Sequence, residues 1–163
     1  MRGIRRKEKE INDNREILRI IREAKYVTIA MTDVDGPYLV TLTHAYHEGK
    51  NAIYFHCAHE GRKVDILKRD NRVWGQALID KGYVQASCDH LYETAQFKGR
   101  VTFVTDPDEK RLALETMIRK NEAKPESVIK DQIDDESVGH VNIGRIDIES
   151  MSGKRSDKVI VSL

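Results

Sequence analysis

The spacing of the apolar residues changes near residue 26. Before that point, residues 12–14 (Asn-Asp-Asn) supply helix-capping side chains. The apolar residues that follow are spaced to lie on one side of a helix: Ile17, Leu18, Ile20 and Ile21. From residue 26 to residue 32, apolar residues instead alternate with small or polar ones, as in a half-buried strand. The pattern therefore predicts a short helix that ends near Lys25, followed directly by a strand.

Two turn-forming clusters divide the next stretch into strands. Residues 33–37 (Asp-Val-Asp-Gly-Pro) and 47–51 (His-Glu-Gly-Lys-Asn) combine glycine with polar residues. They bound runs rich in apolar and β-branched residues at 38–46 and 52–57. Strands joined by such short connections indicate an antiparallel meander.

The middle of the chain predicts one helix and two further strands. The helical pattern covers residues 61–70, and strand-like patterns follow at 72–78 and 96–105. Between these two strands, residues 80–93 show neither period clearly. We expect this stretch to be irregular.

The region after residue 105 predicts two helices. Residues 105–109 (Thr-Asp-Pro-Asp-Glu) are typical of a helix start, because a capping residue precedes a proline and two acids in the first turn. The apolar residues expected to form the buried stripe are Leu112, Leu114, Met117 and Ile118. Pro125 interrupts this pattern, and a second short helix is expected over residues 126–133.

The apolar residues beyond residue 140 predict one last long strand. Their alternation shifts phase near Gly144, which indicates a bulge or a bend there. Residues 152–154 (Ser-Gly-Lys) are expected to form a terminal turn. The alternative is that Lys154 or Arg155 closes over a ligand.

These elements predict a mainly β protein, namely a six-stranded antiparallel split barrel with peripheral helices. A parallel α/β sheet would need helices between most strands, whereas the first three are joined by turns. We expect a single domain over residues 1–163. Its expected parts are an N-terminal arm and helix (1–25), the main barrel strands with a bridging helix at 61–70 (26–105), helices (106–135), and a final strand with a C-terminal tail (138–163).

Composition narrows the function classes. The 28 Lys and Arg residues nearly balance the 27 Asp and Glu residues, which argues against a general nucleic-acid binder. Residues 1–10 lack the apolar core of a secretory signal, and the sequence contains no apolar run long enough to cross a membrane. Cys57 and Cys88 are expected to be free thiols, and we expect a cytoplasmic protein.

The most informative segment is the Gly61-Arg62-Lys63 turn, which connects an apolar strand to a helix. Unpaired backbone N–H groups and the positive end of the helix dipole favour an anion at such a helix start, and the two cations would add charge. The strand at 38–46, with its hydroxyls and aromatic rings, could provide a wall for a flat ligand. The alternative is that Arg62 and Lys63 are only solvated surface charges.

With these residues in view, the chain resembles the FMN-binding split-barrel proteins related to pyridoxamine 5′-phosphate oxidase, and among them the nitroimidazole-resistance reductases. The resemblance is carried by the order and spacing of residues 5–7, Ile11, residues 38–42, 54–58 and 61–63, Gly99 and residues 152–154. Residues 87–92 and 96–98 depart from the usual family pattern, so the resemblance does not name a substrate.

The resemblance implies a homodimer that holds two FMN molecules at its subunit interface. It also implies an oxidoreductase that passes electrons from a nicotinamide-type donor to a small acceptor. His56 is the implied catalytic residue. The implied cofactor-binding residues are Thr41, Leu42, Thr43, His56, Ala58, Gly61, Arg62, Lys63, Tyr92, Gln96 and Lys154, with residues 92–99 contributed by the partner subunit.

Several alternatives stay open at this point. His56 could instead be a neutral core histidine bonded to backbone, and haem or a deazaflavin could replace FMN. A non-catalytic flavin or haem binding or sensing protein is the alternative function. No metal site is expected, because the histidines of the pairs His56/His59 and His44/His47 would point to opposite faces of a strand.

Overall fold

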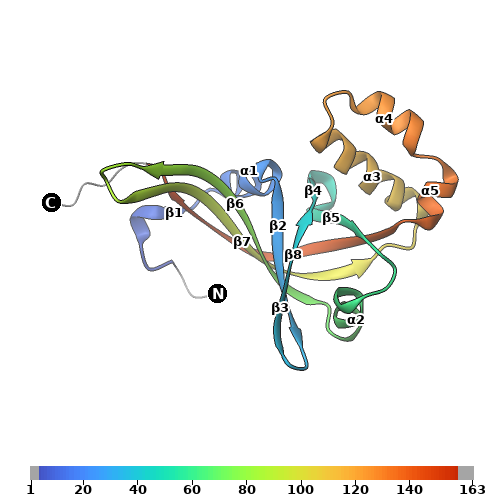
Figure 1. Ribbon diagram of the computed structural model, residues 1–163, viewed down its shortest axis with the longest axis horizontal. Helices are drawn as coiled ribbons and strands as arrows, with labels where there is room; N and C mark the ends of the chain where they lie inside the picture. The colour runs from blue at the N-terminus through green and yellow to red at the C-terminus, as the bar shows by residue number, and fades with distance from the viewer. Residues whose placement is uncertain (1–3, 158–163) are drawn as a thin grey trace.

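The computed structural model describes residues 4–157 and contains one antiparallel sheet of eight strands (Figure 1). The strand order is β3-β2-β6-β7-β8-β5-β4, and β1 pairs with β8 outside this path. The sheet does not close into a complete barrel. The prediction of a mainly β split barrel with peripheral helices is confirmed, but the expected number of six strands is wrong.

The strands differ widely in length. Their bounds are β1 Glu10–Ile11, β2 Tyr26–Asp33, β3 Gly36–Thr43, β4 Ala45–His47, β5 Ala52–Cys57, β6 Arg72–Val84, β7 Asp89–Phe103 and β8 Asn142–Ser156. The helices are α1 Asn14–Glu23, α2 Arg62–Arg69, α3 Pro107–Asn121, α4 Pro125–Gln132 and α5 Asp135–His140, with short 3₁₀ helices η1 Lys7–Lys9 and η2 Glu48–Lys50. Figure 1 shows α3, α4 and α5 grouped at one end of the molecule and the tip of the β6–β7 hairpin at the other.

The core lies inside the curved sheet and is covered on one side by α1. Asp13 caps this helix by accepting a hydrogen bond from the Arg15 backbone, as the capping pattern predicted. The buried core combines α1 with alternate residues of β2 and with large side chains of β5 and β7, namely Ile17, Ile20, Ile21, Val27, Ile29, Met31, Phe55 and Phe97. The change of apolar spacing at residue 26 thus marks the boundary between α1 and β2.

Residues 80–93 form most of a hairpin, so the expected irregular stretch is wrong. β6 continues to Val84 and β7 begins at Asp89, with a shift of register between Asp80 and Tyr83. Most of the side chains at the hairpin end are exposed. Alternation reports burial of one face, and a hairpin arm with both faces in water therefore carries no alternating signal.

The last strand also differs from its prediction. Lys98 pairs with Ser150 whereas Gly99 pairs with Ile148, so the extra residue of the bulge is Glu149. The expected bulge near Gly144 is wrong, because Gly144 pairs regularly with Phe55 and Phe103. A side chain at Gly144 would collide with the Phe55 ring, so packing rather than a bulge accounts for this glycine.

Residues 152–154 belong to β8 and do not form the expected terminal turn. Gly153 pairs with Ile11 of β1 on one side and with Ala95 of β7 on the other. Only tertiary pairing makes this polar segment a strand. The part of the expected C-terminal tail beyond Asp157 lies outside the described residues. Within residues 4–157, no helix is both long and apolar enough to cross a membrane.

Candidate functional site

A row of polar side chains crosses the outward face of four neighbouring strands. Thr41 of β3 pairs with Thr28 of β2, Thr28 pairs with Gln76 of β6, and Gln76 pairs with Gln96 of β7. The hydroxyls of Thr28 and Thr41 lie 3.0 Å apart, within hydrogen-bond distance. The structure therefore brings two of the predicted residues, Thr41 and Gln96, onto one face, which we call the open face.

Large apolar side chains lie beside this polar row. Leu39, Ala30 and Trp74 form the adjacent row, and Leu39 and Trp74 are 60% and 46% exposed. A cavity of about 170 Å³ lies at this place. Its lining residues are Thr28, Ala30, Leu39, Trp74, Gly75, Gln76 and Gln96. Trp74 was not among the predicted site residues, although the alternation of β6, with Val73 and Ala77 buried, indicates that Trp74 faces outward.

The three predicted residues of β3 do not share one face. Thr41 and Thr43 are exposed on the open face, whereas Leu42 is buried in the core. The strand order makes β3 an end strand of the sheet, so part of its backbone has no strand partner. Leu42 can therefore offer a ligand its backbone but not its side chain.

The first turn of α2 offers backbone donors to an anion. Gly61 is the N-cap residue, with φ of +125°, and no side chain caps the helix. N–H groups of a first turn have no partner inside the helix, and glycine cannot supply one from its own side chain. The first turn of α2 therefore leaves backbone N–H groups without a side-chain cap, and the anion site stays a prediction.

Arg62 is engaged with the β2–β3 hairpin. Its Nε and Nη2 atoms donate to Asp33 and Asp35 at 2.7 and 2.8 Å, and its guanidinium lies 4.6 Å from the centre of the Tyr38 ring. Arg69 also donates to Asp33, at 2.8 Å. The Arg62 bond, then the Val34 backbone N–H and Arg69, lower the pKa of Asp33 to about 2. Asp33 therefore stays ionised and holds α2 to the hairpin at physiological pH.

Lys63, next to Arg62, has a different environment. It is half-buried, and its Nζ lies 5.6 Å from the centre of the Phe55 ring. Within the described part of the chain, no carboxylate forms an ion pair with it. Of the two predicted cations, Lys63 is thus the one without an acidic partner there.

His56 is exposed and lies next to α3. It shares a cavity of about 230 Å³ with Thr43 and with the C-terminal half of α3. The histidine that is fully buried is His44, whose Nε2 lies 2.7 Å from the Ile21 carbonyl oxygen. The alternative of a core histidine bonded to backbone therefore describes His44, and not His56.

Polar contacts fix the start of α3 on the sheet. Tyr54 donates to Glu109 at 2.6 Å, and Arg145 donates to the same carboxylate oxygen at 2.9 Å. Burial, followed by this hydrogen bond, raises the pKa of Tyr54, so the phenol stays protonated. The helix start is therefore held by a charge-assisted network.

A second contact fixes the end of α3. Lys120 donates to the Ala24 carbonyl oxygen at 2.8 Å, and its Nζ lies 3.4 Å from Nδ1 of His44. Burial lowers the pKa of Lys120 to about 8. Burial, followed by the charge of the nearby Lys120, lowers the pKa of His44 to about 4. His44 is thus neutral at physiological pH and can lie beside a lysine.

The remaining predicted residues belong to three different segments of the chain. Tyr92 lies on β7 and Lys154 on the neighbouring strand β8, and the Lys154 Nζ lies 5.8 Å from the centre of the Tyr92 ring. Ala58 follows β5, and its carbonyl oxygen accepts a hydrogen bond from Asn142 at 3.0 Å. One chain therefore does not gather every predicted cofactor-binding residue around one point.

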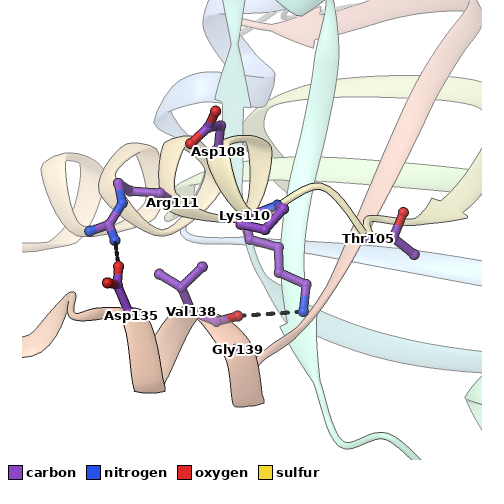
Figure 2. A pocket seen from close by; sticks show the side chains of 8 residues that line it. Thr105, Asp108, Lys110, Arg111, Asp135, Val138 and Gly139 are labelled. Atoms are coloured by element: carbon purple, nitrogen blue, oxygen red, sulfur yellow. Dashed lines mark hydrogen bonds and ion pairs between the residues drawn. The ribbon is translucent and has the colours of Figure 1, made fainter.

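Another cavity, of about 440 Å³, lies between α3 and α5 (Figure 2). Its two cations are engaged with the protein, since Lys110 donates to the Val141 carbonyl oxygen at 2.9 Å and Arg111 donates to Asp135 at 2.8 Å. None of the predicted site residues lines it. Over residues 4–157, no group of three or more His, Cys, Asp or Glu side chains is arranged to hold a metal ion.

Sequence comparison decides the family. Residues 13–155 match the sequence profile of the pyridoxamine 5′-phosphate oxidase family. The chain belongs to this family. The resemblance inferred from the sequence is therefore confirmed. A comparison with curated proteins gave no significant match.

Solved structures show the same family fold. One, described as a candidate 5-nitroimidazole antibiotic resistance protein from Bacteroides thetaiotaomicron, is 28% identical, with a TM-score of 0.75 and coverage of 91% of this chain and 90% of that chain. The flavocytochrome Anf3 from Azotobacter vinelandii is 13% identical, with a TM-score of 0.82 and coverage of 99% and 75%. An FAD and haem binding protein from Mycobacterium smegmatis is 11% identical, with a TM-score of 0.77 and coverage of 95% and 77%.

Membership of the pyridoxamine 5′-phosphate oxidase family bears on how the site is interpreted. The open face, the start of α2 and the cavity at His56 are three separate surfaces of one subunit. They combine planar apolar contacts, backbone donors for an anion and a titratable side chain. Apolar contact area suits a flat ring, and backbone N–H donors suit an anionic group.

Proposed function

We propose that this protein is an FMN-binding oxidoreductase that reduces a small acceptor. The observation that carries the proposal is that this member of the family has both the polar row on the open face and an uncapped helix start that bears Arg62 and Lys63. A flavin phosphate would bind the first-turn N–H groups of α2 and Lys63. Arg62 would join them by releasing its carboxylate partners.

The isoalloxazine ring would lie along β3 and the open face. Hydroxyl and amide groups of Thr41 and Gln96 offer hydrogen bonds to its polar edge, and Trp74 offers apolar contact area. The bound flavin supplies the electron transfer, and the protein supplies orientation and electrostatics. His56 would donate a hydrogen bond or a proton to the acceptor from its ring N–H.

The functional unit in this proposal is a homodimer. A monomer would leave the large apolar residues of the open face in water, including Leu39, Trp74 and Leu78, which are 60%, 46% and 51% exposed. In a twofold arrangement, the partner subunit would add the residues equivalent to Tyr92 of β7 and Lys154 of β8 to the site. This would bring contacts from both subunits to one cofactor.

A nicotinamide-type donor in the cytoplasm would reduce the flavin. Support for this location comes from Cys57 and Cys88, which are both free thiols and fit a reducing compartment. The family resemblance suggests a nitroimidazole-reductase-like or pyridoxamine-phosphate-oxidase-like reaction. Steady-state turnover with reduced nicotinamide and a panel of acceptors would test this step, since a non-catalytic binder would hold the cofactor without turning over.

The proposal is tested first by the absorbance spectrum and the mass of the cofactor released from purified protein. Twin flavin bands and a released mass equal to that of FMN are expected, at one flavin per chain. Two of the related structures are described as a flavocytochrome and as an FAD and haem binding protein, so haem and FAD are specific alternatives. A Soret band, a released mass equal to that of FAD, or a deazaflavin spectrum would show that haem, FAD or a deazaflavin is bound in place of FMN. A colourless protein that takes up none of these cofactors would overturn the proposal.

A further inference from the structure

Two lysines lie beside one tyrosine ring where β1 pairs with the end of β8. The Nζ atoms of Lys9 and Lys154 lie 5.9 and 5.8 Å from the centre of the Tyr92 ring. Tyr92 of β7 is the register partner of Ser156 of β8, and alternation places both residues and Lys154 on the face that carries Gln96. Lys9, Tyr92, Lys154 and Ser156 therefore form one group at the end of the open face, which we call the arm cluster.

Lys9 is a buried cation with a neutral partner. The residue is 8% exposed, and its Nζ donates to the Ser156 hydroxyl at 2.9 Å. An ammonium group has three N–H donors, and within residues 4–157 this hydroxyl is the one acceptor that they meet. Buried lysines in proteins are normally paired with a negative group, because burying an uncompensated charge is costly. Lys9 therefore lacks the counter-charge that its burial calls for.

The carboxylates around the arm cluster are engaged with other cations. Glu10 is the register partner of Lys154, but its carboxylate forms an ion pair with Lys7 at 2.7 Å. The other neighbouring acids are paired as well, namely Glu8 with Arg6, Glu93 with Arg19 and Lys81, and Asp157 with Arg155. Residues 1–3 and 158–163, outside the described part of the chain, contain no Asp or Glu. No aspartate or glutamate of residues 4–157 therefore balances the charge of Lys9 or Lys154.

The Tyr92 ring attracts the two ammonium groups but does not neutralise them. The face of an aromatic ring is partly negative, yet the ring carries no net charge. The arm cluster therefore keeps two positive charges near each other, one of them out of water. A phosphate group has the charge and the oxygen atoms to accept hydrogen bonds from two lysines and a hydroxyl at once.

We propose that the arm cluster is an oxyanion site that binds a phosphate group. Lys9 and Lys154 supply charge-assisted N–H donors, and the Ser156 hydroxyl supplies a neutral one. Lys9 is not among the residues predicted from the sequence, and the cluster shares no element with the start of α2 in the same chain. Oxyanion binding to one chain does not depend on the proposed function. In the proposed dimer, the phosphate comes from the cofactor of the partner subunit or from a second phosphorylated ligand.

Inorganic phosphate is the probe for this site. Its binding to the flavin-free, full-length protein is followed by amide chemical shifts, with sodium chloride at matched ionic strength as the reference for screening. Phosphate should shift the amides of Tyr92 and Ser156 in a saturable way, and chloride should not. Absence of a saturable shift at the arm cluster would overturn the proposal.

Methionine substitutions test the two lysines, because methionine keeps an unbranched apolar side chain and removes the charge. Lys9→Met and Lys154→Met should each weaken phosphate binding by about tenfold or more, since each removes a charge-assisted hydrogen bond. Lys25→Met is the matched control, because the Lys25 Nζ also lies near a tyrosine ring, 5.3 Å from the centre of Tyr26. Wild-type phosphate affinity in both arm variants would show that these lysines do not form the site.

The melting temperature separates a binding role of Lys9 from a purely structural one. The measurement uses Lys63→Ala protein, so that phosphate bound at the start of α2 contributes less. Adding Lys9→Met should leave the melting temperature in phosphate-free buffer unchanged or higher, because an uncompensated buried charge is removed. It should also abolish the rise that phosphate causes. A lower melting temperature with the full phosphate-induced rise would assign Lys9 to the fold alone and overturn its place in the site.

Repeating the phosphate titration with loaded protein identifies the source of the phosphate. Phosphate-induced shifts at Tyr92 and Ser156 that persist in FMN-loaded protein would assign the arm cluster to a second phosphorylated ligand. Shifts that FMN abolishes and riboflavin leaves intact would assign it to the flavin phosphate. Failure to bind any flavin would overturn the proposed function, and the titration of flavin-free protein would still decide whether the arm cluster binds an oxyanion.

Discussion

The Nε atom of Arg62 donates to Asp33 at 2.7 Å, so a cation expected to meet a phosphate is held by a carboxylate. Asp33 also accepts from Arg69, and it is nearly buried, with 11% of its side chain exposed. The proposed anion binding at α2 and the attachment of the β2–β3 hairpin would therefore share one guanidinium. In the proposed complex, a phosphate would compete with these carboxylates for the Arg62 charge, because two of its five N–H groups already donate to Asp33 and Asp35.

This competition gives a prediction for phosphate binding. Lys63→Ala and Arg62→Ala should each weaken FMN binding by about tenfold to a hundredfold, since a charge-assisted bond contributes roughly 1.5–3 kcal/mol. Asp33→Asn should strengthen it by releasing Arg62. Titrations with FMN and with riboflavin, which lacks the phosphate, should show these changes for FMN only. Equal FMN affinity in all three variants would show that the flavin phosphate does not bind at the start of α2.

The buried His44 predicts acid sensitivity of the fold. Its pKa is about 4 in the folded protein against 6.5 for the unperturbed group, so between these values the unfolded state binds more protons. The free energy of unfolding should be highest above pH 6.5 on this account and should fall by on the order of 3 kcal/mol as the pH drops through 4. Urea unfolding at several pH values measures this.

His44→Gln supplies the control for the acid sensitivity. Glutamine can still donate to the Ile21 carbonyl oxygen but does not titrate. The variant should show a flatter pH profile than the wild-type protein between pH 6.5 and 4. An unchanged slope would assign the acid sensitivity to other groups, such as the paired carboxylates.

The open face predicts a subunit interface. Trp74→Lys places a charge among apolar residues that the proposed dimer buries, so it should dissociate the dimer and lower FMN affinity together. Light scattering coupled to size exclusion measures the mass of the species, and a flavin titration measures the affinity. Val34→Lys is the control, because Val34 is 87% exposed in the turn between β2 and β3. A monomeric Trp74 variant with full FMN affinity would separate the interface from the cofactor site.

His56 should affect reactivity more than cofactor binding. His56→Ala leaves the phosphate and backbone contacts intact, so most FMN affinity should remain, whereas a positioned acid or base contributes about 10²–10⁴ in rate. Single-turnover oxidation of the reduced, flavin-loaded protein by an acceptor measures this rate. His59→Ala is the matched control, since His59 is also exposed and hydrogen-bonds the His140 carbonyl oxygen at 2.7 Å. Normal turnover per flavin in the His56 variant would end its catalytic assignment.

Local patterns in the sequence predicted several elements correctly. Helix α1, strand β2, strand β5 and helix α2 follow from apolar spacing and capping residues, because each buries one face against the core and each depends on nearby residues. Helix α5 was not predicted, since it is a short helix with one buried residue, Val138, and carries little apolar spacing. The elements that could be predicted from the sequence are thus those that bury one face of evenly spaced apolar residues.

The sequence by itself determined the family, the mainly β class and the helix start at Gly61, because these depend on residue order and on local capping and alternation. Only the tertiary structure decided that Thr41 and Gln96 share one row, that Arg62 is bound to Asp33, and that α3 forms a cavity with His56. These relationships join segments far apart in the chain, and strand order and register set them. Alternation fixes which face a residue occupies, but it carries no information about which strand lies beside it.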